Sequence, residues 1–218
     1  MDAVIVEPTE IATACVIWLH GLGASGHDFE PIVPVLDKKI TQQTRFIFPH
    51  APQRPVTING NMIMRAWYDV AAIDLTVEQD EEGTRTSEQI IWDYMTQVQQ
   101  QGIDTSRIIL AGFSQGGAIA LHTGLRYPKP LRGIMALSTY LPLAETVATE
   151  RHVENSNIPI FMGHGTFDNV IPIKYAELSK QHLENLGYAV NWYSYGMEHQ
   201  VIPQEINDIN QWLISRLT

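Results

Sequence analysis

Cysteine, basic charge and long apolar runs are all scarce in this chain of 218 residues. Its single cysteine, Cys15, rules out an internal disulfide, and the apolar residues on either side of it predict a buried, inert thiol. No apolar run approaches the length of about 18 residues that a membrane helix needs. The first residues also lack the basic and apolar segments of an export signal. We therefore expect a cytoplasmic protein without stable membrane insertion.

Basic residues are outnumbered, with 14 Lys and Arg against 24 Asp and Glu and a formal net charge of −10. That charge repels the phosphates of nucleic acids and of anionic lipids, so we expect neither as a partner. Metal-binding patterns are lacking too, because the sequence has no H-E-x-x-H and no clustered His and Cys spacing. No metal and no organic cofactor is expected.

Short apolar runs of strand length alternate with longer segments of helical period. This alternation predicts an α/β fold, a mostly parallel sheet covered by helices on both faces. The expected strands are 15–19, 45–48, 107–111, 133–137, 158–162 and 190–195. The length and the lack of a linker predict a single domain over residues 1–218.

Apolar residues at helical spacing predict helices between these strands. One stripe covers 29–36, and a second covers 90–98 behind a capping box formed by Thr86 and Gln89. A third helix follows Ser114, is apolar nearly all round and should end before Pro128. A terminal helix is expected over 202–213.

Two long segments, 49–83 and 141–157, lack a clear period. Long irregular segments of compact domains are often binding elements or lids. The first is rich in Met, Trp and Tyr between positions 62 and 69, and such side chains could line an apolar substrate groove. These side chains could equally pack the segment against the hydrophobic core, and the sequence favours neither alternative.

The segment from Gly112 to Gly116 has the pattern Gly-x-Ser-x-Gly between an apolar strand and an apolar helix. A strand that turns so sharply into a helix needs small residues on both sides of the serine. The turn projects the serine hydroxyl beyond the end of the sheet, where a base and a carbonyl carbon can both reach it. The pattern therefore predicts a nucleophile elbow with Ser114 as the nucleophile.

A serine nucleophile requires a histidine base and a carboxylate that fixes the imidazole tautomer. In this topology the order along the chain should be Ser, acid, His. His199 is the best base, because most other histidines lie before Ser114 or inside helical patterns. His152 and His164 come too early in the chain unless Glu145 or Glu150 is the acid. Asp168 is the only Asp between Ser114 and His199, and it lies just past a strand. Its alternative role is to cap the helix entered at Pro172.

An oxyanion hole completes such a site. The backbone amide after the nucleophile, that of Gln115, should supply one donor, and a loop after an early strand should supply the other. The segment His20-Gly21-Leu22-Gly23 stands in that place, and the Leu22 amide is the candidate donor.

The same loop satisfies the dinucleotide-binding pattern G-x-G-x-x-G from Gly21 to Gly26. That pattern also requires a carboxylate at the end of the next strand, about 20 positions on, to hold a ribose hydroxyl. The next expected strand ends in Pro49-His50-Ala51-Pro52, without a carboxylate. An NAD-binding protein therefore remains only a remote alternative.

With these residues assembled, the chain resembles the carboxylesterase, lysophospholipase and acyl-protein thioesterase family of small α/β-hydrolases. The matching segments are Trp18 to Gly23, Phe48 to Pro52, Ala66 to Asp69, Gly112 to Gly117, His164-Gly165 with Asp168 to Pro172, and Gly196-Met197 with His199. The resemblance implies the α/β-hydrolase fold, the triad Ser114, Asp168 and His199, and oxyanion donors at Leu22 and Gln115. It further implies that the segment with Met64, Trp67 and Tyr68 borders an acyl-binding groove. Ala24, Phe167 and Gln200 depart from the residues most common in the family.

These observations predict a serine carboxylesterase that hydrolyses acyl esters through an acyl-enzyme intermediate. A long-chain lysophospholipase or an acyl-protein thioesterase with the same triad is the close alternative, so the expected partner is a small acyl ester or a lipid, with an acylated protein as the alternative. A catalytically silent binding protein would need a broken triad, for which the sequence gives no evidence. Exposed apolar loop residues would permit a weak homodimer.

Overall fold

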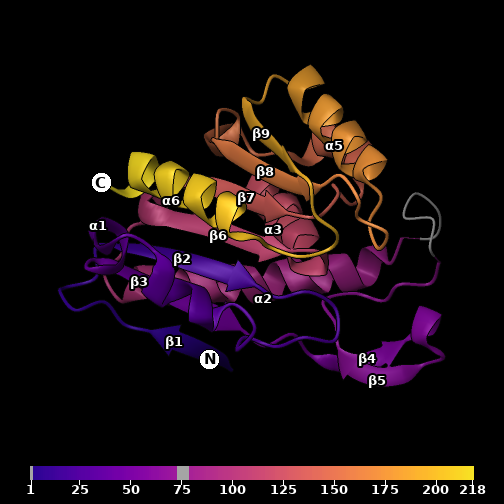
Figure 1. Cartoon of the computed structure of the whole chain (residues 1–218), viewed down its shortest axis with the longest axis horizontal. Helices are drawn as coiled ribbons and strands as arrows, with labels where there is room; N and C mark the ends of the chain where they lie inside the picture. The colour runs from indigo at the N-terminus through magenta and orange to yellow at the C-terminus, as the bar shows by residue number, and fades with distance from the viewer. Residues whose placement is uncertain (1, 73–78) are drawn as a thin grey trace.

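A seven-stranded sheet lies at the centre of the computed structural model, which describes residues 2–72 and 79–218 (Figure 1). Its strand order is β1-β3-β2-β6-β7-β8-β9. The strands are β1 Ala3–Val6, β2 Ala14–Leu19, β3 Thr44–Pro49, β6 Ile108–Phe113, β7 Gly133–Leu137, β8 Ile160–Gly165 and β9 Val190–Tyr195. All neighbours pair in parallel except β1, which adds to β3 in the antiparallel direction. The expected parallel strands are all present, and the edge strand β1 was not predicted.

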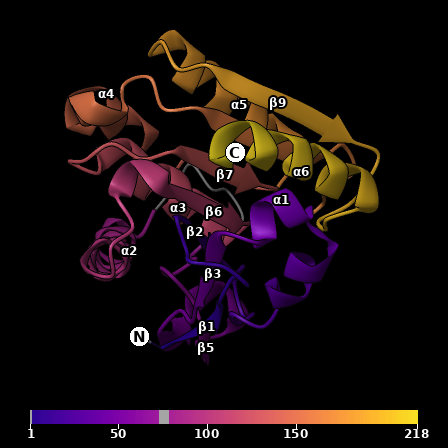
Figure 2. The same ribbon diagram turned by 90° about the vertical axis from the view of Figure 1, so that its left-hand side faces the viewer.

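Helices cover both faces of this sheet, as Figure 2 shows. They are the 3₁₀ helix η1 Glu30–Val35 and the α-helices α1 Lys38–Thr41, α2 Glu81–Gln100, α3 Gln115–Arg126, α4 Val147–Glu150, α5 Ile173–Asn185 and α6 Pro203–Leu217. Alternate residues of β2 face opposite layers, because successive side chains of a strand point to opposite sides. Ile17 packs in the core with α2, α3 and α5, whereas Trp18 packs in the core with η1, α1 and α6. Within the described ranges, no helix has both the length and the apolar character needed to cross a membrane.

Two helix predictions were wrong in detail. Helix α2 begins at Glu81, not behind the predicted box of Thr86 and Gln89, because the Asp80 side chain caps it by accepting from the Gly83 amide at 2.8 Å. The stripe over 29–36 forms the 3₁₀ helix η1, since Pro31 and Pro34 have no amide hydrogen for an α-helical bond. The end of α3 at Arg126 agrees with the prediction.

The segments expected to be irregular carry local structure. Within 49–83, β4 Gln53–Val56 and β5 Met62–Arg65 form an antiparallel hairpin that extends away from the sheet (Figure 1). Residues 73–78 of that segment lie outside the described residues. Within 141–157, the short helix α4 lies between the 3₁₀ turns η4 Ala144–Thr146 and η5 Val153–Asn155.

The strand order reverses direction between β2 and β6. From β2 the chain crosses to β3 on one side, whereas β6 and the later strands add on the other side. The loops that leave the carboxyl ends of β2 and β6 therefore diverge and leave a crevice between them. Ligands of open α/β sheets bind at such a point.

One carboxyl group is buried without a partner where α6 packs against β8. Glu205 is fully buried, and neither of its side-chain oxygens has a hydrogen-bond partner among the described residues. It fits because Gly163 has no side chain, and a Cβ there would overlap the Glu205 carboxyl. Burial, together with the nearby Asp208 charge, raises the pKa of Glu205 to about 8.

Glu205 should make the folded state less stable as pH rises. Its usual pKa is near 4.5, so between that value and about 8 the folded protein holds a proton that the unfolded chain has lost. The contribution of Glu205 to the free energy of unfolding should therefore fall over this interval. In Glu205→Gln, which keeps the neutral shape, the fall between pH 5.5 and pH 8 should be smaller by on the order of 2 kcal/mol, measured by urea denaturation. Glu145→Gln removes an exposed carboxyl and should leave the pH dependence unchanged; equal curves for all three proteins would contradict the assignment.

Candidate active site

Ser114 lies in a strained turn between β6 and α3. Its φ of 55° and ψ of −123° place a non-glycine residue in a region that costs about 1–3 kcal/mol. Two hydrogen bonds hold the turn: the Ser114 amide donates to the Leu137 carbonyl at 2.8 Å, and the Thr139 hydroxyl donates to the Ser114 carbonyl at 2.6 Å. Gly116 is needed for close approach, because a Cβ there would overlap the carbonyl oxygens of Leu19 and His20. The strain is thus maintained by contacts with two neighbouring strands.

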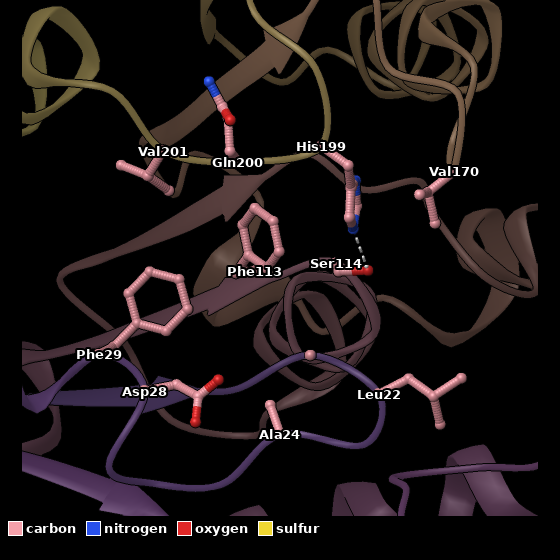
Figure 3. Close-up of a pocket in the computed structure, with 11 residues that line it drawn as sticks. Leu22, Ala24, Asp28, Phe29, Phe113, Ser114, Val170, His199, Gln200 and Val201 are labelled. Atoms are coloured by element: carbon pink, nitrogen blue, oxygen red, sulfur yellow. Dashed lines mark hydrogen bonds between the residues drawn. The ribbon is translucent and has the colours of Figure 1, made fainter.

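The structure brings Ser114, His199 and Asp168 into one hydrogen-bonded chain. His199 Nε2 lies 2.9 Å from Ser114 Oγ, and His199 Nδ1 lies 2.7 Å from Asp168 Oδ2. His199 comes from the loop after β9 and points across the carboxyl end of the sheet toward the serine (Figure 3). An ionised carboxylate can only accept hydrogen bonds, so the His199 proton belongs on Nδ1 and Nε2 is free to accept the serine proton.

Asp168 is held as a carboxylate by the backbone of its own loop. Its Oδ1 accepts hydrogen bonds from the Val170 and Ile171 amides at 2.9 and 2.8 Å. Burial tends to raise the pKa of Asp168, but the hydrogen bonds from His199, Ile171 and Val170 outweigh it and leave this pKa below its usual range. Helix α5 begins after Pro172 rather than after Asp168. The turn that Asp168 closes therefore orients its own second oxygen toward His199.

A second histidine, His164, lies beneath the carboxylate. It is buried in β8, and its Nε2 is 3.5 Å from Asp168 Oδ2 and 2.8 Å from the Ile171 carbonyl. Burial lowers the pKa of His164, which favours the neutral ring. A neutral ring that donates to the carbonyl does not compete with His199 for the carboxylate.

The Leu22 and Gln115 amides lie at the same end of the sheet as Ser114. Within residues 2–72 and 79–218 neither amide donates a hydrogen bond to the protein. The Leu22 loop is fixed by His20, whose Nε2 accepts from the Ala51 amide at 3.0 Å and whose Nδ1 therefore donates to the Gly21 carbonyl at 2.7 Å. Burial lowers the pKa of His20 and keeps it in this neutral form. The loop is thus held with an unused donor beside the serine.

The Gln115 side chain has a separate role that the sequence did not indicate. Its Oε1 accepts from the Trp67 amide at 2.8 Å, and its Nε2 donates to the Tyr68 carbonyl at 2.7 Å. The Trp67 indole donates to the His20 carbonyl at 2.9 Å. These bonds connect the elbow, the loop after β2 and the segment after β5.

Two cavities meet at Ser114. One, of about 350 Å³, is mostly apolar, and its lining includes Ile58, Tyr68, Val70, Tyr140 and Ile171. The other, of about 490 Å³, is shown in Figure 3, and His199 lines only this one of the two. Leu22, Ser114 and Val170 border both cavities and so mark the boundary between them.

Of the predicted substrate-binding residues, the structure places only Tyr68 in these cavities. Its hydroxyl lies 2.9 Å from that of Tyr140 on the wall of the apolar cavity. Trp67 is fully buried beneath the loop after β2 and lines neither cavity, so its role is to support that loop. Met64 also lies outside both linings and accepts a contact from the Asn59 side chain at 3.3 Å. The Gln115 side chain accepts a hydrogen bond from the Trp67 amide and so holds this part of the segment against the elbow. Contact of Trp67 and Met64 with substrate stays a prediction.

Gly116→Ala should destabilise the protein, because the new methyl group meets backbone carbonyls that cannot move freely. We expect the free energy of unfolding to fall by about 1–3 kcal/mol or more in urea denaturation. Gly196→Ala is the matched control, since the nearest atom to its new Cβ is 3.9 Å away, and its change should stay within about 0.5 kcal/mol. Equal stability of the two variants would contradict the close packing of the elbow.

Comparison with known proteins identifies a family and several relatives of this chain. A family model described as phospholipase/carboxylesterase matches residues 1–216. The acyl-protein thioesterase 1 of Cryptococcus neoformans is 35% identical, covering 97% of this chain and 96% of that protein. The acyl-protein thioesterase 1 of Neurospora crassa is 38% identical, covering 94% of this chain and 87% of that protein.

Solved structures are similar over nearly the whole chain. SOBER1 of Arabidopsis thaliana superposes with a TM-score of 0.89 at 29% identity, covering 94% of this chain and 99% of that one. Acyl-protein thioesterase 2 of Zea mays superposes with a TM-score of 0.88 at 27% identity, covering 99% of both chains. The predicted α/β-hydrolase fold is confirmed, and the chain belongs to the phospholipase/carboxylesterase family of serine hydrolases.

Proposed function

We propose that the protein hydrolyses acyl esters and thioesters with Ser114 as nucleophile, His199 as base and Asp168 as the group that orients the base. The observation that carries this proposal is the hydrogen-bonded chain from Asp168 through His199 to Ser114 at the junction of two cavities. We propose further that residues 1–218 act as one catalytic domain that needs no cofactor.

The reaction proceeds in two steps. The Ser114 oxygen attacks the carbonyl carbon while its proton moves to His199 Nε2, and the Asp168 carboxylate stabilises the resulting imidazolium. The Leu22 and Gln115 amides donate to the oxyanion, and one such donor typically stabilises the transition state by about 2.7–4 kcal/mol. The leaving alcohol or thiol takes the proton from His199 as the carbon–oxygen or carbon–sulfur bond breaks. Water, deprotonated by His199, then cleaves the acyl-enzyme.

The position of His199 supports an assignment of the two halves of the substrate to the two cavities. The imidazole must protonate the leaving atom, so the leaving group lies on the side of the cavity that His199 lines. The acyl chain then lies in the other cavity, whose lining of Ile58, Tyr68, Val70 and Ile171 is suited to a hydrocarbon.

The same site supports an acyl-protein thioesterase or a lysophospholipase as the second candidate. The name acyl-protein thioesterase 1 of the relatives at 35% and 38% identity favours the first of these. The chemistry at the carbonyl is common to all, and the length of the acyl chain and the nature of the leaving group distinguish the substrates. An acylated protein or a lipid is accordingly the partner class that we propose beside small acyl esters.

Ser114→Ala should abolish hydrolysis of a short aryl ester, because no other group can form the acyl-enzyme. It should also abolish covalent labelling by a fluorophosphonate probe, measured by mass spectrometry of the intact protein. Ser156→Ala is the matched control, since Ser156 follows η5 at the opposite end of the sheet, and it should label like the native protein. Labelling of Ser114→Ala at another residue would refute the nucleophile.

Ala72→Phe should shift the preferred acyl chain toward shorter lengths, because Ala72 lines the apolar cavity and a phenyl ring would fill part of it. We expect kcat/KM for the longest chain accepted by the native protein to fall at least about tenfold, with little change for acetyl esters. A series of thioesters of one thiol with increasing acyl length measures this shift. Equal losses at every length would contradict the assignment of this cavity to the acyl chain.

A further inference from the structure

The cavity on the leaving-group side has a lining that its role in proton transfer does not explain. Beside His199, the wall includes the rings of Phe29 and Phe113 and the carboxylate of Asp28. Figure 3 shows the carboxylate directed from its loop toward the cavity, on the same side as the two rings. Leu22 and Val170 close the opposite side (Figure 3). An acidic group beside two aromatic rings is a combination that attracts cations.

Asp28 and His199 are the ionisable side chains of this lining. His199 must be neutral to act as a base, so Asp28 supplies the only formal charge. Its Oδ1 accepts a hydrogen bond from the Ser25 amide at 3.2 Å, which fixes the side chain and leaves Oδ2 available. No Lys, Arg or His lies within ion-pair distance of Asp28 in the described part of the chain. Asp28 is exposed, and its carboxylate lines the mouth of the cavity without an ion-pair partner among the described residues.

The two rings are held in place from behind. The centroids of Phe29 and Phe113 are 5.5 Å apart, and Trp18 stacks on Phe29 with centroids 5.2 Å apart. Phe113 also lies 4.7 Å from the His199 ring, so the aromatic wall begins directly beside the proton donor. The face of an aromatic ring attracts an ammonium group, and a quaternary ammonium most readily gives up its water. A cation carried by the leaving group would enter the cavity that both the rings and Asp28 line.

We propose that this cavity is a cation subsite for the leaving group, and that Asp28 is a specificity-determining residue that favours alcohols and thiols bearing an ammonium group. The proposal rests on the proposed function, since the leaving group is placed by His199. The charge of the whole chain, −10, acts in the same direction by attracting cationic substrates and repelling anionic ones.

The test compares three butyryl thioesters that differ only in the leaving thiol. These are the thiocholine ester, its uncharged isostere with a 3,3-dimethylbutyl group, and the ester of anionic 3-mercaptopropionate. In the native protein, kcat/KM should follow the order cationic, neutral, anionic. Asp28→Asn should lower the ratio of the cationic to the neutral ester about threefold to tenfold, because it keeps the shape and removes the charge. The native preference should also weaken as salt is raised.

Glu30→Gln is the matched control. Glu30 lies two residues from Asp28, carries the same charge and pairs with His27 at 2.9 Å, but it does not line the cavity. In Glu30→Gln, the ratio of kcat/KM for the cationic ester to that for the neutral ester should change less than about twofold. Equal effects of Asp28→Asn and Glu30→Gln would assign the preference to overall charge and overturn the subsite.

A second arm separates the two sources of an ammonium group. Short S-butyryl peptides with either lysine or norleucine next to the acylated cysteine test a protonated amine in place of the quaternary ammonium. The subsite is supported if Asp28→Asn removes a preference for the cationic substrate in either the thioester series or the peptide series. It is overturned if the native protein shows no such preference in both series. Ser114→Ala keeps the two proposals apart, because hydrolysis of the neutral ester by that variant would refute the nucleophile and not the subsite.

Discussion

The carboxylate of Asp168 is the group on which the arrangement of the site depends. It accepts hydrogen bonds from two amides of its own loop and from His199, and it thereby connects the loop after β8 to the loop after β9. The pairing of these two strands is parallel and in register up to Gly165 and Tyr195. The sheet therefore sets the distance between the loops, and the local turn sets the direction of the carboxylate.

A comparable connection exists on the other side of the serine. Gln115 lines the apolar cavity, and its side chain holds the segment of Trp67 and Tyr68. The Trp67 indole donates to the His20 carbonyl, and the His20 ring binds the Gly21 carbonyl. That carbonyl belongs to the same peptide group as the Leu22 amide, so His20 also fixes the amide. The segments of Leu22 and Gln115, whose amides donate to no acceptor in the part of the chain that the structure describes, are thus joined by one network of buried hydrogen bonds.

Local patterns predicted the features that depend on a few neighbouring residues. The elbow at Ser114 could be predicted from its local pattern, because a Cβ at Gly112 would overlap Gly116 within the turn, whereas the contact that requires Gly116 comes from the end of β2. The expected order of Ser, acid and His selected Asp168 and His199. The roles of Trp67, His20 and His164 could not be predicted, because each depends on which backbone group from a distant strand lies opposite the side chain. For His20 and His164 a signal was present in the sequence, since both lie at or just after the carboxyl ends of predicted strands. The start of α2 was missed because Asp80 caps this helix before the chain reaches the predicted capping box of Thr86 and Gln89.

The hydrogen bond between Ser114 and His199 joins residues 85 positions apart, and the histidine follows the last strand of the sheet. A chain emerging from the ribosome consequently contains a complete elbow long before it contains the partner of that elbow. Under the proposed mechanism, the serine stays unactivated until the final edge of the sheet has been added, so the nascent chain is protected from premature acylation. The order of elements along the sequence thus makes completion of folding a precondition of reactivity.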